Sequence, residues 1–307
     1  MTTLHLPARP PFQFHSVIRS HGWYQLAPFE WDEASEMLRT VERLESGRVV
    51  ALEISGQPDG VVVAAKPKLT RREEQEVVAK VTWMLGLDSD FNEFYALADA
   101  EPRLAHCREK AYGRLLRSSS LFDDVVKVMM TTNIQWGGTK RLIAALVNYF
   151  GEPLPKDGTR RAFPVAKRIA RSRETTLRKL GLGYRAPYLL NLARGVASGI
   201  VNLETLKDLA RPTEDVRRDL LALPGIGPYA AATLLAILGR YDFIGVDTEA
   251  ISSVSKGFYG GQPVGEKEVN AVFAKWGPYK ALAYWFWDFS GQQQSPMEAW
   301  EMKQSGG

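Results

Sequence analysis

Cysteine and histidine are scarce in this sequence of 307 residues, which contains one cysteine and four histidines. The lone Cys107 excludes a disulfide within the chain, a cysteine-rich zinc site and a four-cysteine iron–sulfur cluster. The histidines show no metal-ligand spacing; they are His5, His15, His21 and His106. We therefore expect no iron–sulfur cluster, no catalytic metal and no cofactor for catalysis.

Long apolar runs and a strong net charge are missing as well. No apolar run reaches the roughly 18 residues that cross a bilayer, and residues 1–14 lack the apolar core of a signal peptide. The net charge is +4, from 39 Lys+Arg and 35 Asp+Glu, which favours an anionic partner only weakly. We expect a soluble cytoplasmic protein with no membrane partner.

Short β-prone stretches dominate the chain before about residue 115. The apolar runs 49–54 and 61–65 flank a Gly/Pro/Asp turn, which predicts a β-hairpin. Thr70 and Glu73 form a capping box, which predicts a helix over 70–85. Residues 35–44 are expected to form a short helical or mixed segment. We infer a mixed α/β domain with an antiparallel sheet.

From residue 122 onward, apolar residues recur at helical spacing. The predicted helices cover residues 122–130, 141–150, 174–180, 185–197, 214–223, 229–238, 266–276 and 279–289. Gly and Pro separate them, with 153–158 expected as a loop. The predicted fold class is α+β, with an N-terminal mixed domain at 1–112, a mostly helical domain at 113–290 and a loose tail at 291–307.

The sharpest local motif is Leu223-Pro224-Gly225-Ile226-Gly227 between two apolar helices. Its two glycines let a ligand approach the backbone closely, and Pro228 suits the first turn of the second helix. The unpaired N–H groups at that helix start form an anion site, for which a phosphodiester is a natural ligand. Such backbone contacts carry little sequence information. The alternative is an ordinary helix–Gly–helix corner.

Asp247 follows an apolar segment about twenty residues later. A carboxylate next to such a segment is costly to bury unless it has a function or a partner. Asp247 can also cap the next helix, since Asp is a favoured N-cap residue. The two roles are compatible.

The hairpin and this aspartate together resemble the helix-hairpin-helix–Gly/Pro–Asp superfamily of DNA glycosylases, with Gly245 at the Gly/Pro position. The resemblance covers residues 113–289 and includes 113–117, 131–133 and 177–186. The segment 177–186 is very close to its counterpart in 8-oxoguanine DNA glycosylases. The N-terminal domain resembles those of 8-oxoguanine glycosylases and of 3-methyladenine DNA glycosylase II.

The resemblance implies an enzyme that flips a damaged base out of double-stranded DNA. Asn133 and Tyr184 would fill and wedge the base stack, and Arg185 would contact the orphaned base. Without the resemblance, Asn133 would be read as a helix cap and Tyr184 as a core aromatic. The hairpin residues implied to contact DNA are Leu223, Gly225, Ile226, Gly227 and Tyr229. The backbone carbonyls of Leu221, Leu223 and Ile226 would hold a structural Na⁺ or K⁺.

By the same resemblance, Asp247 would stabilise positive charge on the sugar or activate water. Tyr229 stands where bifunctional 8-oxoguanine glycosylases carry a lysine that forms a Schiff base. A tyrosine cannot do so, which implies a monofunctional enzyme without AP lyase activity. Lys280 is the alternative nucleophile.

The base pocket implied by the resemblance contains Tyr229, Lys280, Tyr284 and Trp136. Aromatic walls attract a cationic alkylated purine, whereas Lys280 would oppose one and could donate to a carbonyl such as that of 8-oxoguanine. Gly138 replaces an arginine that reads the opposite cytosine in 8-oxoguanine enzymes.

We expect a monomeric glycosylase for alkylated purines of the 3-methyladenine type, associated with the nucleoid when bound to DNA. The alternatives are an 8-oxoguanine glycosylase, with or without lyase activity, and a non-catalytic DNA-binding protein.

Overall fold

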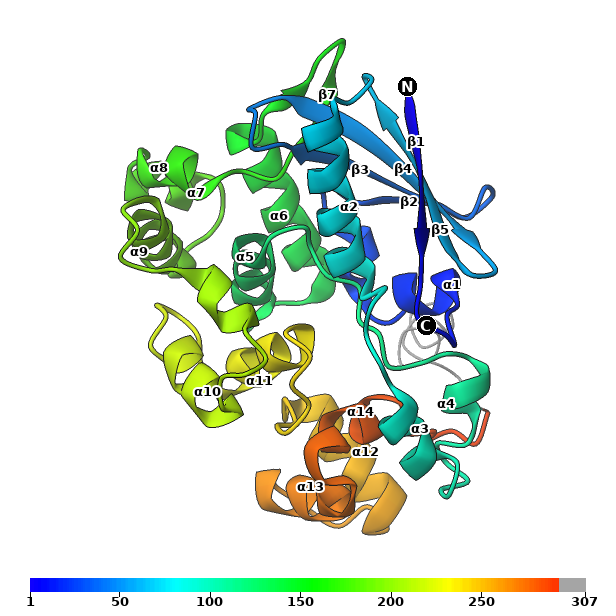
Figure 1. The fold of residues 1–307 in the computed structure, drawn as a ribbon. Helices are drawn as coiled ribbons and strands as arrows, with labels where there is room; N and C mark the ends of the chain where they lie inside the picture. Colours follow the sequence, from blue (N-terminus) through cyan, green and yellow to red (C-terminus); the bar gives the residue numbers. More distant parts are fainter. Residues whose placement is uncertain (293–307) are drawn as a thin grey trace.

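The computed structural model describes residues 1–292, in which a five-stranded antiparallel sheet precedes a mostly helical part (Figure 1). This arrangement confirms the predicted α+β fold class. Apart from its first two residues, the predicted tail 291–307 lies outside the described residues. Within residues 1–292, no helix is long and apolar enough to cross a membrane.

The sheet has the strand order β1-β5-β4-β3-β2, and every neighbouring pair is antiparallel. Its strands are β1 Thr2–Pro7, β2 Glu30–Asp32, β3 Met37–Arg43, β4 Val49–Gln57 and β5 Gly60–Lys66. The predicted hairpin is confirmed as β4 and β5, which pair from Ala51↔Lys66 to Gln57↔Gly60. The tight turn and the buried face both fix this register. A one-residue slip would turn the buried side chains of the strand outward.

Strand β3 overturns the prediction of a helical or mixed segment over 35–44. Its inward-facing side chains are Leu38, Thr40 and Glu42, which are all buried. Two of these three are polar, so the apolar/polar alternation typical of a strand is absent from the sequence. Pairing with β2 on one side and β4 on the other stabilises the strand despite that pattern.

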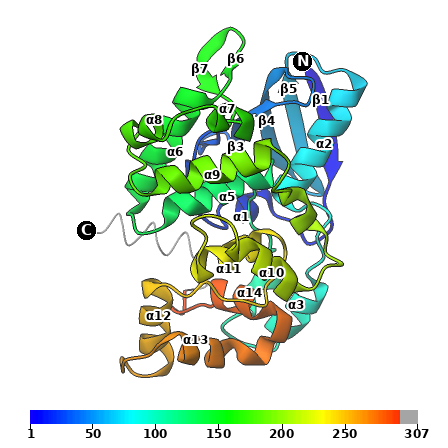
Figure 2. The ribbon, with the colours of Figure 1, turned by 90° about the vertical axis from the view of Figure 1, so that its left-hand side faces the viewer.

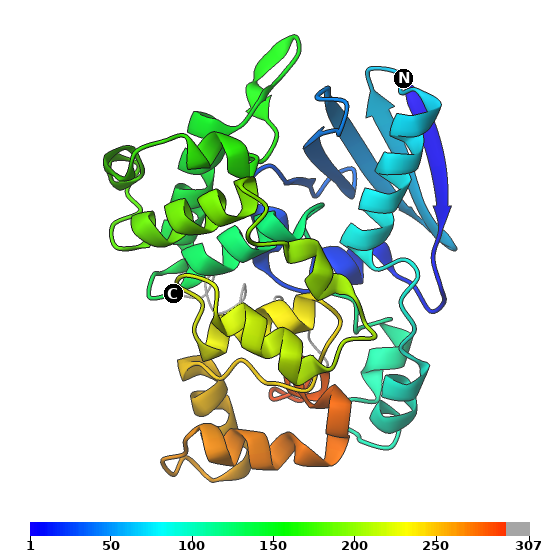
Figure 3. The ribbon, with the colours of Figure 1, turned by 60° about the vertical axis from the view of Figure 1, so that its left-hand side comes forward.

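Helix α2, Arg71–Leu85, lies across one face of the sheet (Figure 3). The predicted capping box is present: the Glu73 N–H donates to Thr70 Oγ1 at 3.4 Å, and the Thr70 N–H donates to Glu73 Oε2 at 2.9 Å. These two bonds satisfy backbone donors that a helix start leaves unpaired. Val77, Val81 and Met84 then pack into the core beneath the sheet.

The helical part confirms the eight predicted helices, with ends shifted by a few residues. The helices and 3₁₀ segments are α1 Phe14–Ile18, η1 Gly22–Gln25, α3 Asn92–Ala98, α4 His106–Glu109, α5 Leu121–Thr131, α6 Trp136–Phe150, α7 Ala166–Ala170, α8 Glu174–Lys179, α9 Arg185–Ala197, η2 Leu203–Lys207, α10 Thr213–Leu221, α11 Pro228–Ile237, α12 Thr248–Phe258, α13 Glu266–Phe273, η3 Ala274–Tyr279 and α14 Lys280–Trp285.

The segment predicted as a loop, 153–158, instead contributes to a small β-hairpin of β6, Pro153–Leu154, and β7, Asp157–Arg161. This hairpin projects from the helical part (Figure 2). Its sequence shows no apolar alternation, so periodicity could not reveal it. The buried Leu154 and Ala162 anchor it in a small apolar cluster with strands β3 and β4.

Two large apolar cores stabilise the molecule. The first joins the sheet and α2 to α5, α6, α9 and α11. The second joins residues 91–115 to the C-terminal helices, with the stacked rings of Tyr112 and Phe286 at 5.0 Å. The sheet and α2 thus pack against the helices in the middle of the chain, and residues 91–115 pack against the C-terminal helices. The domain boundaries at 112 and 290 stay a prediction.

Candidate nucleic-acid interface and active site

Helices α10 and α11 lie side by side and are joined by the predicted tight turn (Figure 2). Leu223 and Ile226 are buried beneath the turn, which holds it against the core. Gly225 has a φ of +76°, and a Cβ there would lie 2.8 Å from the Tyr188 ring. Apart from Gly227 and its two neighbours in the chain, no described residue has an atom within 4 Å of the place where a Cβ of Gly227 would stand. Gly225 thus serves the fold, whereas Gly227 leaves the backbone open to a ligand.

The start of α11 faces outward at this open position. Gly227 is the N-cap residue, Pro228 occupies the first turn, and Gly227, Pro228 and Tyr229 are exposed. The unpaired N–H groups and the positive end of the helix dipole favour an anion here. The turn therefore has the geometry that a phosphodiester requires.

The cation site predicted on Leu221, Leu223 and Ile226 involves the carbonyls of the same turn. The Leu223 carbonyl accepts the Ile226 N–H at 3.2 Å. A carbonyl oxygen has two lone pairs, so this bond leaves one for a cation. The cation at these three carbonyls stays a prediction.

Asp247 is the N-cap residue of α12, and its Oδ1 accepts the Ala250 N–H at 2.8 Å. The side chain is exposed. Although Tyr229 as a whole residue is 37% exposed, burial around its phenol group and the nearby Asp247 charge raise its pKa, and the same two causes raise the pKa of Tyr284. The structure thus brings Asp247 together with two of the four predicted pocket residues.

The backbone at Gly245 lies close to the Tyr229 ring and leaves little room for a side chain. A Cβ at Gly245 would stand 3.3 Å from Thr233 Oγ1 and 3.4 Å from the Tyr229 ring. Thr233 is itself fixed, because its hydroxyl donates to the Tyr229 carbonyl at 3.0 Å. A larger residue at 245 would therefore push on the ring next to Asp247.

The other two predicted pocket residues are placed differently. The ammonium of Lys280 lies over the Phe243 ring, 5.6 Å from its centre. Trp136 donates through Nε1 to Gln25 Oε1 at 2.8 Å and packs against Gly22. The Tyr284 ring packs edge-on against the Phe273 ring, with 5.6 Å between their centres.

The segment 20–25, which includes η1, is a part of this region that the sequence did not reveal. Trp285 Nε1 donates to the Ser20 carbonyl at 3.0 Å, while Trp136 holds the other end through Gln25. Trp136 and Trp285, which lie far apart in the sequence, thus each form a hydrogen bond to one end of the segment 20–25. The run His21-Gly22-Trp23-Tyr24 is rich in aromatic residues, the one signal that could have drawn attention to it.

The predicted stack-filling residues lie close together, Asn133 in the turn between α5 and α6 and Tyr184 at the N-cap of α9. Asn133 has a φ of +49°, and its Nδ2 donates to the Tyr184 hydroxyl at 3.4 Å. Both side chains are exposed. Asn tolerates this left-handed conformation better than most residues, so Asn133 projects from a defined turn towards Tyr184, as a DNA wedge requires.

Arg185 is buried instead of projecting, with an exposed fraction of 5%. Its Nη2 donates to the Thr132 carbonyl, and its guanidinium lies 4.5 Å from the centre of the Tyr184 ring. In this state Arg185 supports the Asn133 turn from below. Its predicted contact with the opposite base requires the side chain to move.

Gly138, which replaces an arginine in the resemblance, is buried at the start of α6. A Cβ there would stand 2.5 Å from the Ile134 side chain. The position has no space for an arginine without displacement of Ile134.

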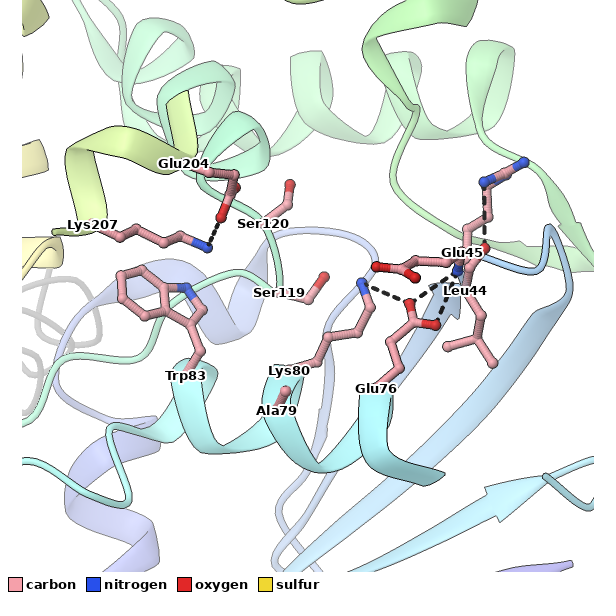
Figure 4. A pocket seen from close by; sticks show the side chains of 11 residues that line it. Leu44, Glu45, Glu76, Ala79, Lys80, Trp83, Ser119, Ser120, Glu204 and Lys207 are labelled. Carbon is pink, nitrogen blue, oxygen red and sulfur yellow. Dashed lines mark hydrogen bonds and ion pairs between the residues drawn. The ribbon is translucent and has the colours of Figure 1, made fainter. Parts of the chain in front are cut away.

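A separate cavity of about 430 Å³ lies between α2, the loop before α5 and η2 (Figure 4). Four of its charged groups pair with one another: Lys207 contacts Glu204 at 2.7 Å, and Lys80 contacts Glu76 at 3.9 Å. None of the predicted site residues lines this cavity. Among residues 1–292, no group of three or more His, Cys, Asp or Glu side chains is placed to hold a metal ion.

Residues 126–278 match the family of HhH-GPD superfamily base excision DNA repair proteins. The chain therefore contains an HhH-GPD domain, which includes the hairpin and Asp247. It is 29% identical to a DNA-3-methyladenine glycosylase of Bacillus subtilis, over 52% of this chain and 54% of the relative. It is 23% identical to an N-glycosylase/DNA lyase of Saccharomyces cerevisiae, over 57% of each. The chain thus spans about half the length of these relatives.

Solved structures share the whole fold. A 3-methyladenine DNA glycosylase from Archaeoglobus fulgidus is 22% identical, covers 92% of this chain and 96% of its own, and has a TM-score of 0.73. An 8-oxoguanine glycosylase/lyase from Clostridium acetobutylicum, in complex with double-stranded DNA, is 18% identical. It covers 92% of this chain and 93% of its own, with a TM-score of 0.69. Both types of glycosylase thus adopt this architecture, which alone does not distinguish their substrates.

Proposed function

We propose that the HhH-GPD domain is catalytic and that the protein is a DNA glycosylase of base excision repair. It binds duplex DNA, flips a damaged purine and hydrolyses its N-glycosidic bond. The observation that carries the proposal is the exposed Asp247, whose charge acts on Tyr229 and Tyr284 next to the hairpin. A pure DNA-binding module gains nothing from a carboxylate there, because it repels the phosphate backbone.

The proposed reaction begins when the C1′–N bond breaks and its electron pair leaves with the base. The Asp247 carboxylate stabilises the positive charge that develops on the sugar. A water oxygen then forms a bond to C1′, and the proton released goes to Asp247. The cap bond from the Ala250 N–H holds the carboxylate in place throughout.

Tyr229 supports hydrolysis without strand cleavage. Its phenol cannot form a Schiff base, and its raised pKa keeps it protonated at neutral pH. Lys280, the alternative nucleophile, has its ammonium over the Phe243 ring. We therefore propose a monofunctional enzyme that leaves an abasic site.

Alkylated purines are the proposed substrates. Two aromatic rings next to a carboxylate attract a base that carries a positive charge. The cation at Lys280, which would repel such a base, lies against Phe243. The buried Gly138 also removes a side chain that would impose cytosine as the opposite base.

Base release from a panel of duplexes tests the proposal, with alkylated purines, 8-oxoguanine, hypoxanthine or uracil as the damaged base. We expect release from the alkylated duplex, strand breaks only after alkali, and no covalent adduct on borohydride treatment. An adduct or direct strand cleavage would instead identify a lyase. Tight binding without release from any duplex would identify a DNA-binding module.

A further inference from the structure

The small net charge of the chain conceals a strongly basic segment. Residues 156–194 contain eleven Lys and Arg but only two acidic residues, Asp157 and Glu174. This segment carries a net charge of +9, so the remainder of the chain, with 28 basic and 33 acidic residues, carries −5. It comprises β7, α7, α8 and most of α9.

Several of these cations are free. Ion pairs occupy Arg160, Arg168 and Arg178, whose partners are Glu30, Glu152 and Glu174. Six others are exposed, and their side chains form no hydrogen bond or ion pair with any residue that the structure describes. They are Lys156, Lys167, Arg171, Arg173, Lys179 and Arg194. We refer to these six as the basic flank.

One end of the basic flank, at Lys179, leads to the stack-filling residues. Helix α8 ends at Lys179, and the short loop 180–184 then leads to the exposed Tyr184. In Figure 2, α7 and α8 lie on one side of α9, and the hairpin of α10 and α11 lies on the other. DNA wedged at Asn133 and Tyr184 would thus have the hairpin on one side and the basic flank on the other.

A row of contacts connects the two sides. The Tyr188 ring lies against Gly225 of the hairpin, and the Tyr184 ring lies 6.4 Å from that of Tyr188. Tyr184 in turn accepts the hydrogen bond from Asn133. The surface is therefore continuous from the hairpin to the end of α8.

We propose that the basic flank is a second DNA-backbone site, which binds the phosphates of the duplex on the side of the lesion opposite the hairpin. Exposed, unpaired cations bind phosphates by charge and release counterions. Such contacts are independent of sequence, as a search along undamaged DNA requires. The proposal rests on the proposed function for the identity of the polyanion.

Binding of an undamaged duplex as a function of salt concentration tests this proposal. The test variant carries Arg171→Gln, Arg173→Gln and Lys179→Gln. The matched control carries Lys68→Gln, Arg71→Gln and Lys267→Gln, which replace exposed cations outside the flank. Both variants lose the same charge, so a difference between them reports position and not net charge.

We expect a shallower dependence of log affinity on log salt in the test variant. The magnitude of the negative slope should fall by about 3, since each lost phosphate contact is worth about 0.9. Its affinity at low salt should fall at least about tenfold, and the control should keep a slope within about 1 of wild type. Equal slopes in the two variants would overturn the proposal.

The two proposals fail in different ways. Wild type that releases a base while the test variant keeps its salt slope would refute the basic flank alone. Wild type that binds duplex with the expected loss in the test variant, yet releases no base, would refute the glycosylase function and retain the second backbone site.

Discussion

At the scale of single residues, the two glycines of the hairpin look alike in sequence and differ in structure. Gly225 needs its positive φ and lies against Tyr188, whereas Gly227 has an ordinary backbone in open space. A side chain at Gly225 therefore damages the fold, while a side chain at Gly227 damages the approach of a phosphate.

The matched pair Gly225→Ala and Gly227→Ala separates these roles. Gly225→Ala should lower the free energy of unfolding by about 1–2 kcal/mol from the left-handed backbone alone, with a further cost from the clash with Tyr188. Gly227→Ala should stay within about 0.5 kcal/mol of wild type and weaken duplex binding. Denaturant unfolding and a binding titration measure both, and a stable Gly225→Ala would contradict the account.

His21 gives the structure an acid-sensitive residue. Burial lowers its pKa to about 4 from 6.5, with a smaller contribution from the Lys127 charge, although a bond to the Leu116 carbonyl opposes the shift. The unfolded chain binds a proton at this histidine below pH 6.5, and the folded chain does not until about pH 4. Stability is therefore lost as the pH falls through this window.

We predict a loss of roughly 3 kcal/mol from His21 between pH 6.5 and pH 4. Denaturant unfolding across this range should show a shallower pH dependence in His21→Gln, whose amide can still donate to Leu116. The exposed His5→Gln is the control and should follow wild type. Parallel curves for all three proteins would show that the pKa of His21 is not lowered in the fold.

Residue identities predicted part of the site. The Asp247 cap was predicted from the preference of Asp for helix starts, and its bond to Ala250 confirms it. The burial of Arg185 and the contact of Lys280 with Phe243 were not predicted. Those two follow from tertiary packing around each side chain, which no local pattern encodes.

At the scale of elements, the elements with local signals were predicted and those stabilised from a distance were not. Helix α2 has its own capping box, and the β4–β5 hairpin has its own turn. Strand β3 buries Thr40 and Glu42, so only its two neighbouring strands make it a strand. The β6–β7 hairpin likewise depends on a distant cluster that includes Val41 and Val49.

The capping box provides the prediction at this scale. Thr70→Ala removes the acceptor for the Glu73 N–H and should lower the free energy of unfolding by about 1 kcal/mol. Thr70→Ser keeps the hydroxyl and should stay close to wild type. Denaturant unfolding of the two variants measures the difference. Equal destabilisation by Ala and Ser would show that the methyl group of Thr70, and not its hydroxyl, stabilises the helix start.

At the scale of the whole molecule, the fold places the charges and rings that the proposed chemistry needs along one continuous surface. The basic flank, the Asn133–Tyr184 pair and the hairpin follow one another, and Asp247 lies next to Tyr229 at the start of α11. The sheet and the residues 91–115 support this surface through the two cores. The composition does not reveal this arrangement, because the net charge of +4 is the sum of the basic segment 156–194 and an acidic remainder of the chain.

The central claim is that Asp247 acts in catalysis as well as in the cap. Asn caps a helix as well as Asp does, so Asp247→Asn removes the charge and keeps the bond to Ala250. Asp247→Ala removes both and should also lose about 1 kcal/mol of stability.

The most direct test is single-turnover base release from an alkylated duplex by wild type and Asp247→Asn at saturating enzyme. We predict a rate about 10²–10⁴-fold lower for Asp247→Asn, with unfolding free energy within about 0.5 kcal/mol of wild type and unimpaired binding of the duplex. Release by Asp247→Asn at the wild-type rate would contradict the account, because the carboxylate would then be a helix cap and nothing more.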